Sequence, residues 1–349
     1  MIRVLVVEDS PTVRARLCEV LAADPGLRVV GEAADGQQAI AACQALQPNV
    51  ITLDMMMPKV SGLQATEFIM AHCPTPILVV SASINRGELF RTYDALAAGA
   101  VDVLDKPLGT EPDGAWEQRF IAAVKMVARI RVVTHLRGRL AGAAVPGGAA
   151  LVPPAPLPYR ALALGTSTGG PGALVQVLRA LPPPLPMPLL VVQHLAEPFG
   201  AAFAEWLGAQ SPHPVRHPVD GEPLAAAAGA VVVAPPGRHL ALVHGRLRLS
   251  DAAPRHSCRP SVDVLFESLA AELHGGCAAA LLTGMGHDGA AGLLALRRAG
   301  AWTIAQDEAS SVVWGMPREA AALGAAAEVL PLAAIGPALA ALLRRPRWR

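Results

Sequence analysis

The stretch Leu162-Ala-Leu-Gly165-Thr-Ser167-Thr-Gly169-Gly170-Pro171 starts as an apolar run and then breaks into small residues around a single serine. This pattern predicts a buried strand that turns sharply into a helix. A serine hydroxyl is a weak nucleophile near neutral pH, so an enzyme that uses one needs a nearby base and free backbone N–H groups for an oxyanion. The glycines would leave such backbone exposed, but a phosphate-binding loop or a purely structural connection fits the same residues.

Further apolar runs on both sides of this serine predict an α/β sheet, because helical stretches separate several of them. The predicted strands are Ala161–Leu164, Leu189–Val192, Ala230–Ala234, Ala278–Leu282 and Trp302–Ala305. The segments His239–Val243 and Arg246–Ser250 alternate in polarity around His244-Gly245. They predict a β-hairpin attached to the periphery of this sheet.

Ser167, His194 and Asp288 each follow one of the predicted strands. The carboxyl ends of parallel strands meet at one edge of a sheet, so these side chains are expected to lie together. Histidine can take the proton of the serine, and a carboxylate can orient the histidine, whereas singly His194 and Asp288 would be a strand end and a helix cap. The glycines around Met285 would expose an N–H group suited to an oxyanion. The order serine, histidine, aspartate differs from that of α/β-hydrolases and argues against that fold.

The first third of the chain repeats the alternation of apolar runs and helical stretches and predicts a second doubly wound parallel sheet. The runs are Ile2–Val7, Leu27–Val30, Asn49–Leu53, Pro76–Val80 and Val101–Leu104. The polar residues that follow them are Glu8, Asp9, Asp54, Ser81 and Lys106. Clustered carboxylates repel one another unless a hard cation such as Mg²⁺ lies among them. A lysine and a hydroxyl opposite would suit a phosphoryl group.

The length and composition predict two globular domains, since 349 residues with 52% hydrophobic content can form two cores. We place the first domain at residues 1–139, a linker at 140–158 and the second domain at 159–345. A helix predicted over Glu117–His135 closes the first domain. The segment Ala141–Pro158 is rich in alanine, glycine and proline and has no periodicity, which is typical of an extended linker.

The charge balance and the cysteines exclude several classes of protein. A formal net charge of +1 with 16% charged residues gives no basic footprint for nucleic acid or a membrane surface. The five cysteines, Cys258 among them, form no Cys-x-x-Cys pair and are expected to be reduced thiols of a cytoplasmic protein. No apolar run reaches the roughly 18 residues of a membrane helix.

The acidic cluster of the first third resembles the receiver domain of two-component response regulators. The resemblance implies that Asp54 accepts a phosphoryl group from a histidine kinase. It also implies that Mg²⁺ is bound by Glu8, Asp9, Asp54 and the carbonyl of Met56, that Ser81 and Lys106 contact the phosphoryl group, and that the Lys106–Pro107 bond is cis. Receivers often have an aromatic residue where this chain has Val103, so the path of the signal out of the domain is left open.

The second domain is similar to the chemotaxis response-regulator protein-glutamate methylesterases. The similar segments are Gly165–Pro171, Gln193-His194, Arg259–Phe266, Leu282–Gly292 and Ala301–Gln306. The resemblance implies that the second domain is a doubly wound, Rossmann-like parallel sheet. It also implies a catalytic triad of Ser167, His194 and Asp288, with Thr168 beside the histidine and the Met285 N–H in the oxyanion hole. His287 stands where the family commonly has asparagine, but its position next to Asp288 does not make it face the serine, so His194 remains the expected base.

The family hydrolyses glutamyl methyl esters on the cytoplasmic helices of chemoreceptors, and members also deamidate receptor glutamines. The resemblance therefore implies a phosphorylation-regulated esterase that needs Mg²⁺ for receiver phosphorylation and no cofactor for ester hydrolysis. One alternative is a paralogue that acts on another methylated or amidated protein. Another is a receiver-driven binding module with a silent second domain, against which the intact Ser167, His194 and Asp288 argue.

Overall fold

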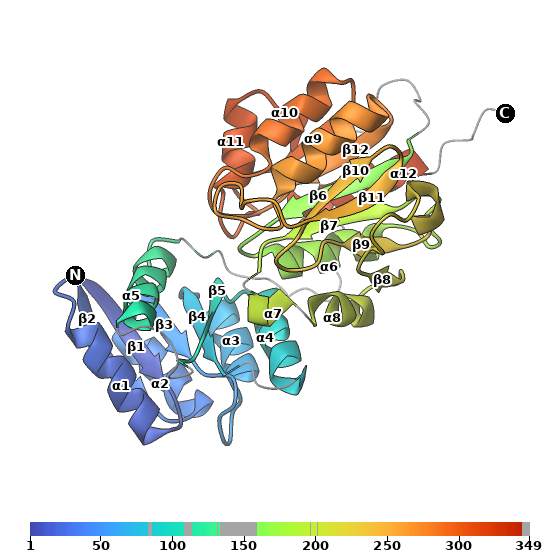
Figure 1. The fold of residues 1–349 in the computed structure, drawn as a ribbon. Helices are drawn as coiled ribbons and strands as arrows, with labels where there is room; N and C mark the ends of the chain where they lie inside the picture. Colours follow the sequence, from blue (N-terminus) through green and yellow to red (C-terminus); the bar gives the residue numbers. More distant parts are fainter. Residues whose placement is uncertain are drawn as a thin grey trace. The chain divides into compact units, whose positions relative to one another are not determined.

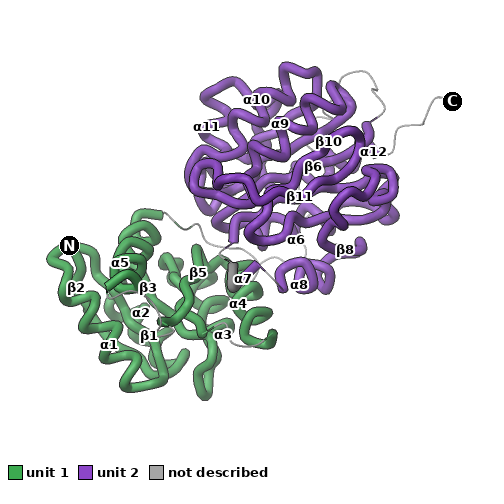
Figure 2. The backbone as a smooth tube through the Cα atoms, viewed as in Figure 1, with its two compact units in different colours: residues 1–145 green, residues 146–349 purple. Residues whose placement is uncertain are grey.

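The computed structural model describes residues 1–82, 86–107, 114–130, 132, 159–195, 197–200 and 202–343. The chain divides into two compact units, Met1–Val145 and Pro146–Arg349 (Figure 2). The predicted linker, residues 140–158, lies outside the described residues, so its bounds stay a prediction. None of the described helices is long and apolar enough to cross a membrane.

The first unit is built on a five-stranded parallel sheet in the order β2-β1-β3-β4-β5 (Figure 1). Its strands are β1 Ile2–Val7, β2 Leu27–Ala33, β3 Val50–Leu53, β4 Ile77–Ser81 and β5 Asp102–Asp105. This order is that of flavodoxin-like folds, and it places the topological switch point between β1 and β3. The doubly wound sheet predicted for this part of the chain is confirmed.

Among the described residues of this unit, five helices accompany the sheet. They are α1 Pro11–Ala22, α2 Gly36–Leu46, α3 Gly62–His72, α4 Arg86–Ala98 and α5 Ala115–Val127. The helix predicted to run to His135 was wrong in its end, since α5 stops at Val127. Backbone hydrogen bonds that span three residues instead of four, from Arg129 N to Met126 O and from Ile130 N to Val127 O, close its C-terminal end.

The second unit has a seven-stranded parallel sheet in the order β14-β13-β12-β6-β7-β9-β8. Its strands are β6 Ala161–Thr166, β7 Leu189–Gln193, β8 Val215–Arg216, β9 Val231–Val233, β12 Cys277–Leu281, β13 Trp302–Gln306 and β14 Glu328–Leu330. Without the short edge strand β8, this is the Rossmann order, and its switch point lies between β6 and β12. The Rossmann-like sheet predicted from the sequence is confirmed, with two edge strands, β8 and β14, added.

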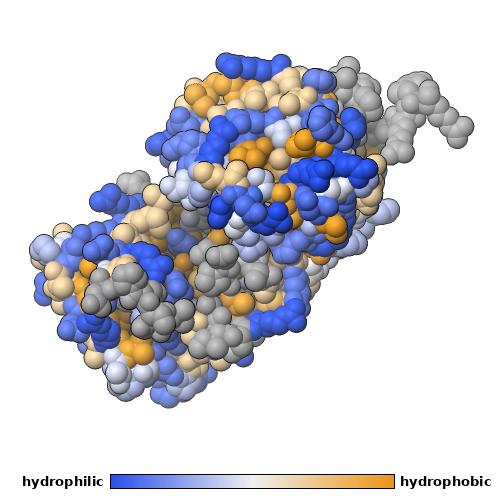
Figure 3. Space-filling model, viewed as in Figure 1, coloured by the Kyte–Doolittle hydropathy of each residue, from blue (hydrophilic) through white to orange (hydrophobic). Residues whose placement is uncertain are grey.

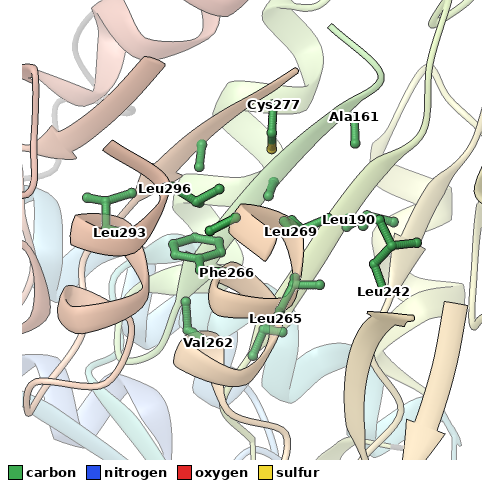
Figure 4. Close-up of a cluster of buried hydrophobic side chains, with 14 of the residues drawn as sticks. Ala161, Leu190, Leu242, Val262, Leu265, Phe266, Leu269, Cys277, Leu293 and Leu296 are labelled. Carbon is green, nitrogen blue, oxygen red and sulfur yellow. The ribbon is translucent and has the colours of Figure 1, made fainter. Parts of the chain in front are cut away.

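The predicted hairpin is present as β10 His239–Val243 and β11 Arg246–Ser250, but it forms a separate two-stranded sheet. The expectation that it attaches to the larger sheet was wrong. Its apolar side is covered by helix α9, Val262–Leu273, where Leu242 joins the same buried cluster as Leu265 and Phe266 (Figure 4). A hydrogen bond of 2.9 Å from Leu242 N to Ser268 Oγ fastens the hairpin to that helix.

Helices and the central strands enclose the core of the second unit. The remaining helices are α6 Gly170–Ala180, α7 Glu197–Gly200, α8 Phe203–Gln210, the 3-10 helix η2 Leu224–Ala227, α10 Ala290–Arg298, α11 Met316–Ala322 and α12 Leu332–Leu343. Gly292 lets α10 lie close against α9, since a Cβ there would fall 2.7 Å from the Cβ of Phe266. On the face shown in Figure 3, hydrophilic and hydrophobic residues alternate over the surface, while the large apolar side chains of the cluster are buried.

Replacement of the buried Phe266 by alanine tests this core. We expect Phe266→Ala to lower the free energy of unfolding by about 3–5 kcal/mol, because it removes a fully buried ring and leaves a cavity. Denaturant unfolding of the full chain measures the change. Val219→Ala is the control, since Val219 is 68% exposed and should shift stability by less than about 0.5 kcal/mol. Equal free energies of unfolding for Phe266→Ala and Val219→Ala would contradict the burial of Phe266 in the core of the second unit.

Candidate active site

Ser167 lies directly after β6 and before α6, at the switch point of the second sheet. Its backbone N–H donates to Thr283 O at 3.0 Å, and the Gln193 side-chain amide donates to Ser167 O at 2.9 Å. Gly169 has a φ of 78°, in the left-handed region that favours glycine, and starts the turn into α6. The half-buried serine is therefore held from both neighbouring strands.

His194 directly follows β7, and its ring is fixed by two contacts. Nε2 donates to Asp288 Oδ2 at 2.9 Å, and Nδ1 lies 3.6 Å from the sulfur of Cys258. Within the described part of the chain, no hydrogen bond joins the Ser167 hydroxyl to this ring. The structure thus brings His194 and Asp288 into contact. Ser167 follows β6, the strand that pairs with β7. Nδ1 of His194, the nitrogen that would accept the serine proton, contacts Cys258 instead.

Asp288 is buried at the N-terminus of α9 and accepts several hydrogen bonds there. Its donors are Ser261 Oγ at 2.7 Å, Val262 N at 2.7 Å and Asp263 N at 3.2 Å. The cap of the following helix α10 is Gly289, so Asp288 satisfies the N-terminus of a different helix from the one that its sequence position indicates. Burial opposes ionisation, but the hydrogen bonds from His194, Ser261 and Val262 outweigh it and hold the Asp288 pKa below its usual value.

The same contacts raise the pKa of His194. Burial disfavours the charged imidazolium, but the Asp288 carboxylate and the Cys258 sulfur together raise the pKa of His194 to about 9. The ring of this arrangement is therefore protonated near neutral pH. A histidine base must be neutral to accept a proton, so its competence increases as the pH rises.

The loop after β12 supplies a candidate oxyanion donor. Gly284 lies against the serine, because a Cβ on it would fall 2.8 Å from Ser167 Cβ. The next residue, Met285, is 51% exposed, and among the described residues its N–H has no acceptor. A free N–H group one residue from the contact with Ser167 suits a developing negative charge. Thr283 Oγ1 donates to Thr168 O at 2.9 Å and ties this loop to the serine turn, whereas a contact between Thr168 and His194 stays a prediction.

His287 is exposed and pairs with a different histidine. Its Nε2 lies 2.8 Å from Nδ1 of His256, and the two rings meet edge to face. His256 in turn contacts the buried Asp263, with 3.1 Å between Nε2 and Oδ2. Of these rings, His194 alone is hydrogen-bonded to the carboxylate of Asp288 in the described structure, which supports it as the base.

The acidic cluster of the first unit lies at the ends of β1 and β3. One oxygen each from Glu8, Asp9 and Asp54 lies within 4.8 Å of the others. Lys106 Nζ lies 2.8 Å from Glu8 Oε2 and 3.1 Å from Asp54 Oδ1. Burial raises the pKa of Asp54, and the Lys106 ammonium counteracts this rise. An all-carboxylate set at this spacing fits Mg²⁺, which prefers oxygen ligands.

The other predicted receiver residues lie around Asp54. The backbone N–H of Met56 donates to this carboxylate, while the proposed metal contact of the Met56 carbonyl stays a prediction. Ser81 is buried at the end of β4, and its carbonyl accepts from Lys106 N at 2.9 Å. Val103 is buried in β5. The cis X–Pro bonds of the described residues are Pro183–Pro184 and Arg259–Pro260, so the expectation of a cis Lys106–Pro107 bond was wrong; Lys106 reaches both carboxylates without it.

Cys258 and Ser261 are the site residues that the sequence analysis missed. Both come from the segment before α9, which does not follow a strand of the sheet. The signal for Ser261 was present in Arg259-Pro-Ser261-Val-Asp263, where a serine directly before a helical stretch is typical of a helix N-cap, whereas this motif does not include Cys258. That pattern predicts the start of α9 but not that its cap also binds the Asp288 carboxylate.

The first unit has the flavodoxin strand order and an acidic strand edge. The second unit has the Rossmann strand order and carries a serine, a histidine and an aspartate at its strand ends. This combination in one chain is that of a response-regulator enzyme. Residues 4–112 match the response regulator receiver domain model, and residues 162–339 match the CheB methylesterase model. The chain belongs to the CheB methylesterase family, in the form that carries a receiver domain.

Full-length relatives and a solved structure agree with this assignment. The chain is 46% identical to protein-glutamate methylesterase/protein-glutamine glutaminase 2 of Anaeromyxobacter dehalogenans (strain 2CP-C), over 98% of this chain and 97% of the relative. It is 44% identical to protein-glutamate methylesterase/protein-glutamine glutaminase 4 of Myxococcus xanthus (strain DK1622), over 95% of this chain and 94% of the relative. The CheB methylesterase catalytic domain of Thermotoga maritima matches with a TM-score of 0.50 and 33% identity, covering 53% of this chain and all of that domain (100%).

A titration of the His194 ring tests the electrostatics of the site. We expect Asp288→Asn to lower the His194 pKa by about one unit or more, because the variant removes the negative charge that favours the imidazolium. NMR of the ring signals as a function of pH measures it. Asp251→Asn is the control, since Asp251 is an exposed carboxylate paired with Arg238. A His194 pKa unchanged by Asp288→Asn would show that the carboxylate does not charge the ring.

Proposed function

We propose that this chain is a phosphorylation-regulated protein-glutamate methylesterase and protein-glutamine glutaminase whose nucleophile is Ser167. The observation that carries the proposal is the His194–Asp288 pair anchored at the N-terminus of α9, one strand from Ser167. The relatives that match nearly the whole chain bear the names of both activities. The alternative, a paralogue with another modified substrate, is not favoured.

The proposed reaction assigns one role to each of these side chains. Ser167 Oγ attacks the carbonyl carbon of the glutamyl methyl ester, and His194 Nδ1 takes the hydroxyl proton. The negative oxygen of the tetrahedral intermediate accepts from the Met285 N–H. The imidazolium then protonates the departing methoxide, which leaves as methanol. Water, deprotonated by the same ring, hydrolyses the acyl-enzyme; with a glutamine substrate, ammonia leaves instead.

Asp288 positions the base in this scheme. Its carboxylate fixes Nε2 as the donor nitrogen of His194, which leaves Nδ1 with the lone pair that the serine needs. In the structure this nitrogen contacts Cys258, so the ring has to exchange the sulfur for the serine hydroxyl before it can act. Deprotonation and a small ring or serine movement therefore precede attack.

The receiver provides the regulation. Asp54 accepts the phosphoryl group from a chemotaxis histidine kinase, and Ser81 and Lys106 contact it. Glu8, Asp9, Asp54 and the Met56 carbonyl would hold Mg²⁺, whose charge would neutralise the phosphoryl oxygens. The proposed substrates are the methylated cytoplasmic helices of chemoreceptors, which places the enzyme in the cytoplasm.

Methanol release from methylated receptor membranes tests the chemistry. We expect Ser167→Ala to lower the rate by about three orders of magnitude or more, since it removes the attacking atom, and His194→Ala to be similarly damaging. His287→Asn is the matched control, because this exposed ring contacts His256 instead of Asp288. If His287→Ala silenced the enzyme while His194→Ala spared it, the base would be His287.

Labelling by a small phosphodonor tests the receiver. We expect Asp54→Asn to abolish labelling, because an amide cannot form an acyl phosphate, and we expect chelation of Mg²⁺ to do the same. Asp35→Asn is the control, since Asp35 is a buried carboxylate that caps α2 and pairs with Lys59. Label that persisted on Asp54→Asn would place the phosphoryl group on another residue.

A further inference from the structure

Cys258 and His194 have the spacing of two ligands on one metal ion. The distance from Cys258 Sγ to His194 Nδ1 is 3.6 Å. Zn²⁺ binds sulfur at about 2.3 Å and imidazole nitrogen at about 2.0–2.1 Å, so two such ligands on a tetrahedral ion lie about 3.5 Å apart. The sulfur and the nitrogen could therefore bind the same ion with almost no change in their separation.

The histidine is supported in the manner of a metal ligand. Its other nitrogen, Nε2, donates to Asp288, and that carboxylate is itself fixed by Ser261 Oγ and the first N–H groups of α9. Metal-bound imidazoles in proteins almost always donate their second N–H to a carboxylate, a carbonyl or water, which orients the ring and raises its basicity. The arrangement that serves the esterase thus also prepares Nδ1 for a metal.

The cysteine is held by a tight turn. Arg255 and Cys258 pair through two backbone hydrogen bonds, of 2.8 Å and 3.1 Å. The two residues between them, His256 and Ser257, have φ values of 51° and 62°, which non-glycine residues rarely adopt. Local backbone strain of this kind concentrates at functional sites. The turn presents a half-buried sulfur to His194 instead of packing it in the core.

We propose that His194 Nδ1 and Cys258 Sγ form a binding site for a borderline-soft dication such as Zn²⁺, and that the bound ion switches the esterase off. The thiol and the Nδ1–H of the imidazolium lose their protons to solvent, a metal–sulfur bond forms, and the freed lone pair of Nδ1 is donated to the metal with no change of oxidation state. That lone pair can then no longer take the proton of Ser167. The inhibition rests on the proposed function, whereas the binding does not.

Ligand chemistry separates this site from that of the receiver. Thiolate and imidazole favour Zn²⁺, Co²⁺ and related ions, while the carboxylates of Glu8, Asp9 and Asp54 favour Mg²⁺. One chain would therefore take an activating hard ion at one strand edge and an inhibitory softer ion at the other. Water completes the coordination at the His194–Cys258 site, as at zinc sites with an open position.

A competing location for the ion is the exposed pair of His256 and His287. Their facing nitrogens are 2.8 Å apart, and Asp263 supports His256 from behind. This pair offers two imidazoles and no thiolate. Cobalt distinguishes the two locations, because a thiolate bound to Co²⁺ gives a charge-transfer absorption in the near ultraviolet that imidazole ligands do not give.

Addition of Co²⁺ to the metal-free full chain is the first experiment. We expect the thiolate band in the wild type and in Cys18→Ser, which removes another half-buried cysteine from the receiver. We expect no band in Cys258→Ser, and none in His194→Gln, a second variant that guards against misfolding of the first. Absence of the band from the wild type, or its persistence in folded Cys258→Ser, would overturn the site.

Inhibition of ester hydrolysis by Zn²⁺ is the second experiment. We expect Cys258→Ser to need at least about tenfold more Zn²⁺ for half-inhibition than the wild type or Cys18→Ser, because a ligand is lost and losing even a residue that only supports a ligand lowers metal affinity by about 10–100-fold. The double variant with His256→Ala and His287→Ala should be inhibited like the wild type. If that variant escaped inhibition while Cys258→Ser did not, the ion would lie at the imidazole pair. A metal-free wild type without esterase activity would refute the proposed function and leave the cobalt result to decide the site.

Discussion

The second unit depends on one buried anion, the carboxylate of Asp288. It accepts from a histidine of one strand end, from the Ser261 hydroxyl and from the first backbone N–H groups of α9. A buried carboxylate is costly unless it is fully hydrogen-bonded, and a helix N-terminus leaves N–H groups that need acceptors. The N–H groups of α9 supply the donors that the Asp288 carboxylate needs, and the carboxylate supplies the acceptor that those N–H groups need. The carboxylate that caps the start of α9 therefore also orients the His194 ring.

In both sheets of this chain the polar side chains gather at the carboxyl ends of strands near the switch point, but the two groups of side chains suit different chemistry. In both, the functional side chains follow strands beside the point where the strand order reverses, between β1 and β3 in the first and between β6 and β12 in the second. The first edge collects carboxylates and a lysine and suits a cation and a phosphoryl group. The second collects a serine, a histidine and glycine-rich backbone and suits an oxyanion. The parallel sheet supplies position, and the residues after each strand supply the reaction.

This rule also explains what the sequence could and could not predict. Ser167, His194 and Asp288 were predicted to lie at one sheet edge because each follows an apolar run, and the run is visible without the structure. Cys258 comes from a turn between the hairpin and α9, and its approach to His194 depends on how that turn packs. The edge strands β8 and β14 are two and three residues long and too short to show a period. The independent sheet of the hairpin depends on Leu242 meeting α9, a contact between segments that local pattern does not connect.

His194 is not in the arrangement that the proposed reaction needs, because its ring is protonated and its Nδ1 contacts Cys258 instead of Ser167. With a pKa of about 9, the ring must lose a proton before it can serve as a base, which costs about 3 kcal/mol at pH 7. The Cys258 sulfur contributes to this cost, since it raises the pKa and also lies at the nitrogen that Ser167 must reach. Substrate that enters between the sulfur and the ring would reduce the cost by displacing the contact. Under the proposed function, Cys258 thus restrains the base until a substrate displaces its sulfur from Nδ1, whereas the proposed metal ion would bind both groups.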